Sequence, residues 1–174
     1  ITAGLPLSSL SEWLGSRRLV RVMPNTPLQI GQGAVAFCTD AEVSAEDKAV
    51  VRRIFEPVAL VAEVDETQMD AVTAISGSGP AYVFEFIRAL SDAGETAGLP
   101  AELAQKLTVQ TVLGAARMVY DGLGSPEELR RAVTSPGGTT AAGLEVLEAH
   151  HFQELMREVA AAARQRSVEL GRGV

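Results

Sequence analysis

The sequence predicts an α/β layer over residues 1–65, followed by an all-α part over residues 66–174. In the first part, short β-prone runs alternate with helical patterns, which is typical of an α/β layer. After Glu63, apolar residues recur at helical spacing and no convincing strand follows. We therefore expect a domain boundary near Asp65.

Three runs in the first part are expected to be strands. They are short and bounded by proline, asparagine or glycine, which interrupt strands. These runs are 19–23, 34–39 and 58–62. A short helix is expected over 5–14, with Gly15 as its C-cap. A second helix begins at Ser44, and Asp47 three positions later matches a capping box.

Serine, glycine and proline mark the helix starts in the second part. Ser78-Gly79-Pro80 is expected to open one long helix, and Pro100 another. Ser125-Pro126 combines an N-cap with a proline in the first turn. A last helix is predicted from about Phe152 towards Leu170. These starts predict a helical domain.

Several of these helices have wide or two-sided apolar faces, as over 71–82 and 103–119. We expect Leu103, Leu107 and Leu113 to point inward. A monomer of this size can hardly cover every such face, and exposed apolar faces usually mark an interface. We therefore predict a homodimer through the helical part and leave higher oligomers open.

The composition is globular, with 47% hydrophobic residues, 21% charged residues and a formal net charge of -7. No Lys/Arg cluster suggests a nucleic-acid partner, and no apolar run is long enough to span a bilayer. The single cysteine, Cys38, excludes an internal disulfide and fits a reducing compartment, so we expect a cytoplasmic location. With one cysteine and only the adjacent His150 and His151, no metal site is expected.

The segment most informative for function is 133–140, with the sequence Val-Thr-Ser-Pro-Gly-Gly-Thr-Thr. Pro136 ends the preceding helix, two glycines let the backbone turn, and Thr139 begins the next helix. A helix N-terminus with free N–H groups and hydroxyls is a site for a carboxylate or phosphate. The same residue types also form ordinary turns. The residues alone leave a tight interhelical turn and an anion site about equally open.

Three segments, in order along the chain, resemble the sequence motifs of the pyrroline-5-carboxylate reductases. They are Arg-Val-Met-Pro-Asn-Thr-Pro at 21–27, Asp-Ala-Val-Thr-Ala-Ile-Ser-Gly-Ser-Gly-Pro-Ala-Tyr at 70–82, and the signature at 126–148 that contains Val-Thr-Ser-x-Gly-Gly-x-Thr. The resemblance covers nearly the whole chain. It implies the C-terminal portion of a Rossmann-type domain, followed by a helical dimerisation domain. It also implies the NAD(P)H-dependent reduction of 1-pyrroline-5-carboxylate to L-proline.

The resemblance further implies the residues of the site. Thr140 is implied to be catalytic, near the ring nitrogen, and backbone N–H groups of 135–140 to bind the substrate carboxylate. The implied substrate-binding residues are Glu66, Ser135, Gly137, Gly138, Thr139 and Thr140. The implied contacts of the cofactor, NADPH or NADH, are Ile1, Thr2, Ala3, Met23, Pro24 and Asn25. For Glu66, an exposed helix-start glutamate favoured by the macrodipole remains the alternative.

One family feature, the dinucleotide fingerprint G-x-G-x-x-G, is missing. Gly31-Gln32-Gly33 lacks the third glycine, and Gly77-Ser78-Gly79 follows a helical segment. We therefore expect the chain to begin inside the Rossmann domain, to bind NADPH weakly or not at all, and to be inactive alone. The alternative is a non-catalytic dimerisation module of the same family. The choice between NADH and NADPH stays open because it depends on residues near the ribose.

Overall fold

The computed structural model describes residue 1 and residues 3–172. Its backbone contacts divide the chain into two compact units. Unit 1 comprises Ile1–Ala81 with Arg157–Val174, and unit 2 comprises Tyr82–Met156. The predicted boundary near Asp65 rests on the change from strands to helices, whereas the two units are defined by contacts within the fold. The boundary stays a prediction.

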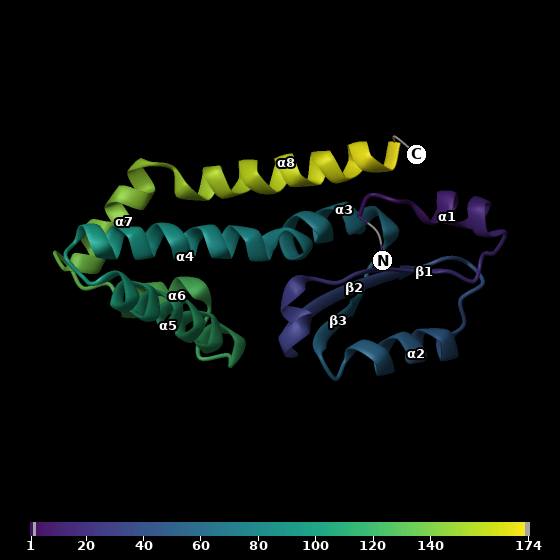
Figure 1. Cartoon of the computed structure of the whole chain (residues 1–174), viewed down its shortest axis with the longest axis horizontal. Helices are drawn as coiled ribbons and strands as arrows, with labels where there is room; N and C mark the ends of the chain where they lie inside the picture. Colours follow the sequence, from purple (N-terminus) through teal and green to yellow (C-terminus); the bar gives the residue numbers. More distant parts are fainter. Residues whose placement is uncertain (2, 173–174) are drawn as a thin grey trace. The chain divides into compact units, whose positions relative to one another are not determined.

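Unit 1 is built on a three-stranded sheet in the order β1-β2-β3 (Figure 1). The strands β1 (Val20–Met23), β2 (Gly33–Thr39) and β3 (Ala59–Glu63) lie where the sequence predicts them. β1 pairs antiparallel with β2, and β2 pairs parallel with β3. The short η1 turn (Thr26–Ile30) joins the antiparallel pair, whereas a parallel pair needs a longer crossover, here a helix.

One face of the sheet is covered by the helix α2 (Ala45–Phe55) (Figure 1). The apolar residues packed together there come from all three strands and the helix, and include Val22, Val35, Phe37, Val51, Phe55 and Val61. The predicted capping box is present. Asp47 N donates to Ser44 Oγ at 3.2 Å, and Ser44 N donates to Asp47 Oδ2 at 3.1 Å. These bonds satisfy two N–H groups at the helix start.

The helices α1 (Leu7–Leu14) and α3 (Met69–Val72) lie over the opposite face. The buried residues that meet at this face are Leu7, Cys38 and Met69. Phe37 and Cys38 are neighbours in β2 and point to opposite faces, because side chains alternate along a strand. Gly15 closes α1 with a φ of 62°, as its sequence position predicts.

A carboxylate connects α1 to the end of β2. Asp40 accepts hydrogen bonds from Ser11 Oγ at 2.5 Å and from Arg17 Nη2 at 2.9 Å. The bond from Ser11, followed by those from Arg17 and the Ala41 amide, lowers the pKa of Asp40 to about 2. An unfolded aspartate has a pKa of about 3.9. Stabilisation by ionised Asp40 is therefore present above that value and is lost as the pH falls towards about 2.

The substitution Asp40→Asn is expected to lower the thermal unfolding temperature of the chain at neutral pH. The difference from the unchanged chain should shrink as the pH falls from about 4 towards about 2. Thermal unfolding followed by circular dichroism across this range measures the effect. Glu42→Gln, at an exposed neighbouring position, serves as the control. A difference that stays constant across the acid range would contradict this role for Asp40.

After β3 the chain is helical, as its spacing predicts, and the long helix begins next to the predicted start at Ser78. The turn η2 (Glu66–Gln68), α3 and the π-helical turn η3 (Thr73–Gly77) precede the long helix α4 (Gly79–Thr96). In η3, Ser78 N donates to the carbonyl oxygen of Thr73, five residues earlier, at 2.8 Å. Such a turn inserts one extra residue into a helix, a pattern that hydrophobic spacing does not reveal.

The C-terminal helix α8 (Phe152–Arg172) contacts the start of the chain within unit 1. Ser167 is buried, and its Oγ donates to Asp70 Oδ1 at 2.7 Å. A Cβ added at Gly171 would lie 2.2 Å from the carbonyl oxygen of Gly4. Glycine at position 171 therefore permits this close approach of backbone to backbone.

Unit 2 contains α5 (Ala101–Tyr120), α6 (Pro126–Ala132) and α7 (Thr139–Ala149), together with most of α4. The three buried residues of this unit are small or polar: Ser91, Ala104 and Thr108. A Cβ added at Gly94 would lie 3.0 Å from the Cβ of Ala104, so α4 and α5 pack closely. No helix among the described residues is both long enough and apolar enough to cross a membrane.

Large apolar side chains of α4 and α5 remain exposed. Leu103, Leu107 and Leu113 are 44%, 50% and 62% exposed, so the prediction that they point inward is wrong for a single chain. The physical reason is that close α4–α5 packing buries the small residues between the helices and leaves the larger ones outside. Phe86 and Leu90 of α4 are exposed in the same way.

Candidate functional site

The turn that precedes α7 is formed by Ser135, Pro136, Gly137 and Gly138. Gly138 N donates to the Ser135 carbonyl oxygen at 3.0 Å. Gly137 has a φ of 69°, the left-handed value that a type II turn requires after proline. A Cβ added at Gly138 would lie 2.5 Å from Ser135 Oγ. Each glycine therefore meets a distinct steric requirement of the turn.

The helix α7 begins on this turn with free hydrogen-bond donors. Its N-cap is Gly138, which supplies no side-chain cap, and Ala142 N donates to the Gly138 carbonyl oxygen at 3.1 Å. The preceding N–H groups, those of Thr139, Thr140 and Ala141, have no partner within the helix. Both threonines are exposed. Free N–H groups and the helix dipole together favour an anion at this point.

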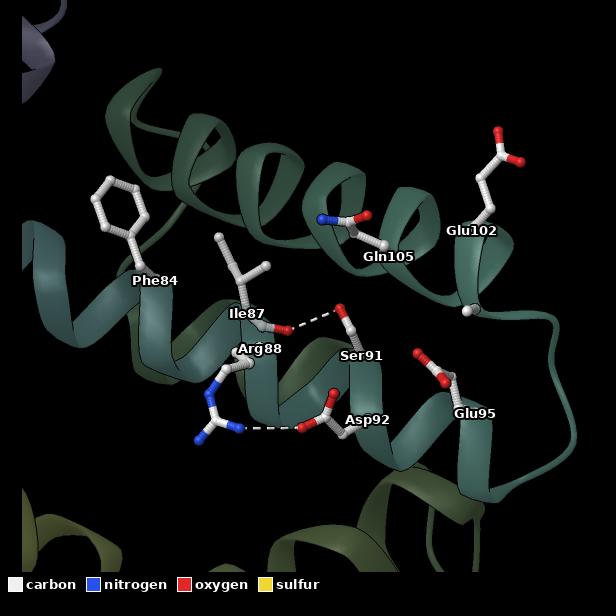
Figure 2. Close-up of a pocket in the computed structure, with 9 residues that line it drawn as sticks. Phe84, Ile87, Arg88, Ser91, Asp92, Glu95, Glu102 and Gln105 are labelled. Carbon is white, nitrogen blue, oxygen red and sulfur yellow. Dashed lines mark hydrogen bonds and ion pairs between the residues drawn. The ribbon is translucent and has the colours of Figure 1, made fainter.

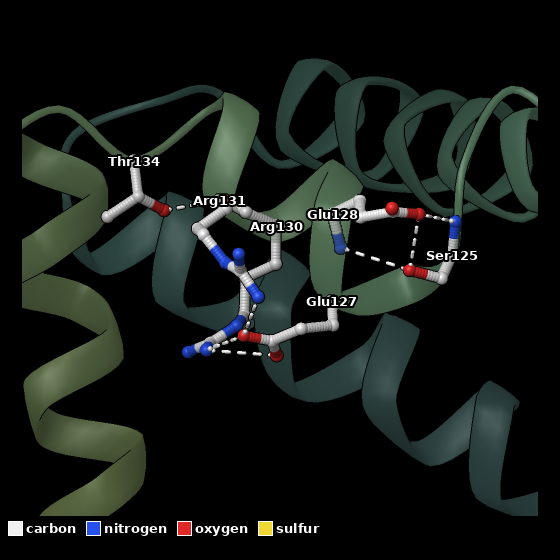
Figure 3. A network of polar contacts seen from close by, with 6 residues as sticks. All are labelled: Ser125, Glu127, Glu128, Arg130, Arg131 and Thr134. Atoms are coloured by element: carbon white, nitrogen blue, oxygen red, sulfur yellow. Dashed lines mark hydrogen bonds and ion pairs between the residues drawn. The ribbon is translucent and has the colours of Figure 1, made fainter.

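The helix α6 precedes the turn in the chain, and Figure 3 shows its polar contacts. Its N-cap is Ser125, as the sequence predicts, and Glu128 completes a capping box with it. Hydrogen bonds from Arg130, and then from Arg131, lower the pKa of Glu127. At the C-terminal end of α6, Thr134 Oγ1 donates to the Arg130 carbonyl oxygen at 2.6 Å. These contacts stabilise the short helix that leads into the turn.

Glu66 lies in unit 1, at the start of η2. Its Oε1 accepts a hydrogen bond from Leu7 N at 2.5 Å and lies 3.9 Å from Arg21 Nη1. The side chain is 39% exposed. Glu66 therefore places its carboxylate at the N-terminus of α1, where the helix dipole favours a negative charge. This contact with a second helix is a feature that the sequence does not indicate.

Met23, Pro24 and Asn25 lie at and just after the carboxyl end of β1. Asn25 Oδ1 accepts a hydrogen bond from Ala34 N at 2.9 Å. A Cβ added at Gly77 would lie 2.4 Å from Met23 Cε, so Met23 packs directly on η3. The end of β1 is thus held by β2 on one side and by η3 on another.

Ile1 and Ala3 are exposed and precede Gly4, which contacts α8. Thr2, also predicted to contact the cofactor, lies outside the described residues. The residues predicted at the end of β1, at the start of the chain and at Glu66 belong to unit 1. Those of the segment 135–140 belong to unit 2.

A separate cleft, about 560 Å³ in volume, lies between α4 and α5 (Figure 2). Phe84 and Ile87 contribute apolar surface to it. Its polar side chains include Ser91, whose Oγ donates to the Ile87 carbonyl oxygen at 2.8 Å, and Arg88, whose Nη1 lies 3.2 Å from Asp92 Oδ2. None of the predicted site residues lines this cleft.

No role for Arg21 is predicted from the sequence. Its side chain is 3% exposed within β1. Nε and Nη2 are buried and have no hydrogen-bond partner in the part of the chain that the structure describes. One sequence feature could have pointed to Arg21: it is a charged residue inside the apolar run Leu19-Val20-Arg21-Val22-Met23. Arginine is rarely fully buried, so its presence in a buried strand is unusual.

These features define a class: an α/β unit built on a three-stranded sheet, joined to a helical unit that carries an exposed, side-chain-uncapped helix N-terminus and exposed apolar faces. The family model described as pyrroline-5-carboxylate reductase dimerisation matches residues 66–170. The chain belongs to the pyrroline-5-carboxylate reductase family.

Curated relatives and solved structures agree with this family. The chain is 48% identical to the pyrroline-5-carboxylate reductase of Pseudomonas aeruginosa, over 98% of this chain and 63% of the relative. It is 47% identical to that of Arabidopsis thaliana, over 98% of this chain and 62% of the relative. It therefore spans less than two thirds of either. The crystal structure of Plasmodium falciparum pyrroline carboxylate reductase with NADP bound matches with a TM-score of 0.91 and 40% identity, over 97% of this chain and 68% of that one. The predicted fold class is confirmed.

Proposed function

We propose that this chain supplies the substrate-binding turn and the dimerisation helices of a reductase. The reaction is the NAD(P)H-dependent conversion of 1-pyrroline-5-carboxylate to L-proline. The observation that carries the proposal is the N-terminus of α7, where three N–H groups without helical partners and an exposed threonine hydroxyl follow a glycine turn. The names of the relatives support the choice of substrate.

The substrate combines a carboxylate with a ring C=N bond, and the start of α7 offers a partner for each. The N–H groups of Thr139, Thr140 and Ala141 hold the carboxylate. The hydroxyl of Thr140 lies on the first turn of the same helix, exposed, and makes no hydrogen bond within the described residues. It is therefore free to orient the ring nitrogen and to donate a hydrogen bond to it as the C=N bond is reduced.

NADPH or NADH supplies the hydride when bound, and this chain would orient its nicotinamide end. Met23, Pro24 and Asn25 fit this task because they lie at and just after the end of β1, where the family resemblance implies cofactor contacts. Their positions are held by the Asn25–Ala34 hydrogen bond and by the packing of Met23 on η3. The exposed N-terminal residues Ile1 and Ala3 are proposed to line the same site.

We also propose that the protein is a homodimer through its helical part. Val83, Phe86 and Leu90 are spaced at i, i+3 and i+7, which makes one exposed apolar stripe on α4. A second copy of the chain would cover this stripe together with the exposed leucines of α5. The match to a dimerisation family model supports this partner. The predicted cytoplasmic location stays a prediction from composition.

An assay of the full-length gene product tests the proposed reaction. We expect oxidation of NADPH or NADH to depend on 1-pyrroline-5-carboxylate, with proline formed in equal amount and identified by chromatography. Open-chain imines and β-hydroxy acids serve as control substrates and are expected to react poorly. A stable dimer that forms no proline would instead favour a non-catalytic dimerisation module.

The 174-residue chain, assayed in parallel, is expected to bind NADPH weakly or not at all and to form no proline. The physical reason is that its sequence contains no G-x-G-x-x-G turn to hold the pyrophosphate. A fluorescence titration measures the binding. An affinity in the micromolar range for this chain would contradict the expectation.

A further inference from the structure

Arg21 is a buried cation on the face of the sheet that α1 and α3 cover. Its side chain is 3% exposed, and its cross-strand neighbour in β2 is Cys38. Directly paired residues of adjacent strands lie on the same face of a sheet. Cys38 belongs to the cluster with Leu7 and Met69, so the Arg21 side chain enters the sheet's α1/α3 side.

The arginine at this position carries a cost in stability. Its Nε and Nη2 are buried without a hydrogen-bond partner among the described residues. A buried charge with unpaired donors opposes folding, and a well-packed apolar residue of similar volume often serves stability as well or better. Packing alone therefore does not explain why an arginine occupies this position. The positive charge of its side chain must have another role.

That charge faces Glu66. The Oε1 of Glu66 lies 3.9 Å from Arg21 Nη1 and 2.5 Å from Leu7 N. Both contacts use the same oxygen, while 39% of the Glu66 side chain is exposed. One oxygen is thus held by the protein, while Oε2 makes no hydrogen bond in the part of the chain that the structure describes and can take another partner.

The thiol of Cys38 lies in the same electrostatic environment. Burial, followed by the charge of Glu66, raises the pKa of Cys38 to about 11, and the charge of Arg21 opposes this rise. Cys38 is therefore neutral at physiological pH and does not compensate the charge of Arg21. The carboxylate of Glu66 is the counter-charge.

We propose that Arg21 is a positioning residue for Glu66. It holds one oxygen of the carboxylate against the first turn of α1 and leaves Oε2 to accept a hydrogen bond from a protonated imine nitrogen, the form of an imine that accepts a hydride most readily. The inference rests on the proposed function, because it takes the imine substrate from that proposal.

The amide of Leu7 reports on this arrangement without any need for activity. In the ¹⁵N-labelled 174-residue chain, Arg21→Gln is expected to shift the Leu7 amide resonance and to speed its hydrogen exchange by at least about tenfold. Glu66→Gln should act in the same direction, and Arg21→Lys should lie between Arg21→Gln and the unchanged chain. Arg52→Gln removes a guanidinium from the ion pair with Glu63 in the same unit and is the matched control. A Leu7 amide that does not respond to Arg21→Gln overturns the proposal.

A comparison of stability with activity separates positioning from a merely structural role. Arg21→Met should leave the unfolding temperature of the chain unchanged or higher, because Glu66 remains partly hydrated. In the full-length gene product it should lower kcat/KM by at least about tenfold. Adding Arg21→Met to Glu66→Gln should cause little further loss, since the two residues act together.

If Arg21→Met lost stability in proportion to its loss of activity, the proposal would be overturned, because Arg21 would then only support the fold. Full additivity of Arg21→Met and Glu66→Gln would overturn it as well. Absence of proline formation by the unmodified full-length protein contradicts the proposed function instead. In that case the Leu7 amide still decides whether Arg21 positions Glu66.

Discussion

Replacing Thr140 by valine in the full-length gene product is expected to lower kcat for proline formation by about 100-fold to 1000-fold. Valine has nearly the shape of threonine and keeps the backbone N–H, but it cannot donate a hydrogen bond to the ring nitrogen. The carboxylate contacts at the start of α7 remain, so KM should change little. Steady-state kinetics with varied 1-pyrroline-5-carboxylate separate the two constants.

Two further variants sharpen this result. Thr140→Ser keeps the hydroxyl and should retain most of the turnover. Thr96→Val is the matched control, because Thr96 Oγ1 donates to the Asp92 carbonyl oxygen within α4, far along the sequence from the turn. If Thr140→Val formed proline as fast as the unchanged protein, the hydroxyl would have no role in the reaction.

The double substitution Phe86→Glu and Leu90→Glu is expected to weaken the homodimer by at least about 100-fold. Both side chains are exposed on one stripe of α4, and a second chain that covered the stripe would bury two unpaired carboxylates. Analytical ultracentrifugation of the 174-residue chain measures the effect. We expect a dimer for the unchanged chain at tens of micromolar and a monomer for the variant.

The control for this experiment is Gln153→Glu, which adds a negative charge at an exposed polar position of α8. It should leave the sedimentation unchanged. An unchanged chain that sediments as a clean monomer, or a double variant that dimerises normally, would show that the stripe on α4 is not the interface. Circular dichroism of the double variant checks that its helices remain folded.

Local patterns predict most of the elements. Gly15 ends α1, Ser44 and Asp47 cap α2, and Ser125 caps α6, because each of these signals acts within one helical turn. The turn before α7 is also predicted by a local pattern, because proline and glycine restrict its backbone conformation. The residue types of 135–140 therefore indicate a candidate site, and its anion-binding role stays a prediction.

Contacts between distant segments escape this kind of prediction. Met23 packs on Gly77 at the end of η3, and the exposure of Leu103 and Leu113 depends on which side of α5 meets α4. Hydrophobic spacing identifies an apolar face but not its partner. For this reason, residues expected inside one chain lie on its surface.

The amino-acid sequence sufficed for the strands, the helix caps, the glycine turn and the family, since these depend on residue types a few positions apart or on motifs that can be read directly. Only the folded chain brings Arg21, Glu66 and the first N–H of α1 together, and only it leaves Nε and Nη2 of Arg21 buried without partners among residues 1 and 3–172. The physical reason is that burial and charge pairing are properties of surfaces meeting in space, which no local pattern encodes.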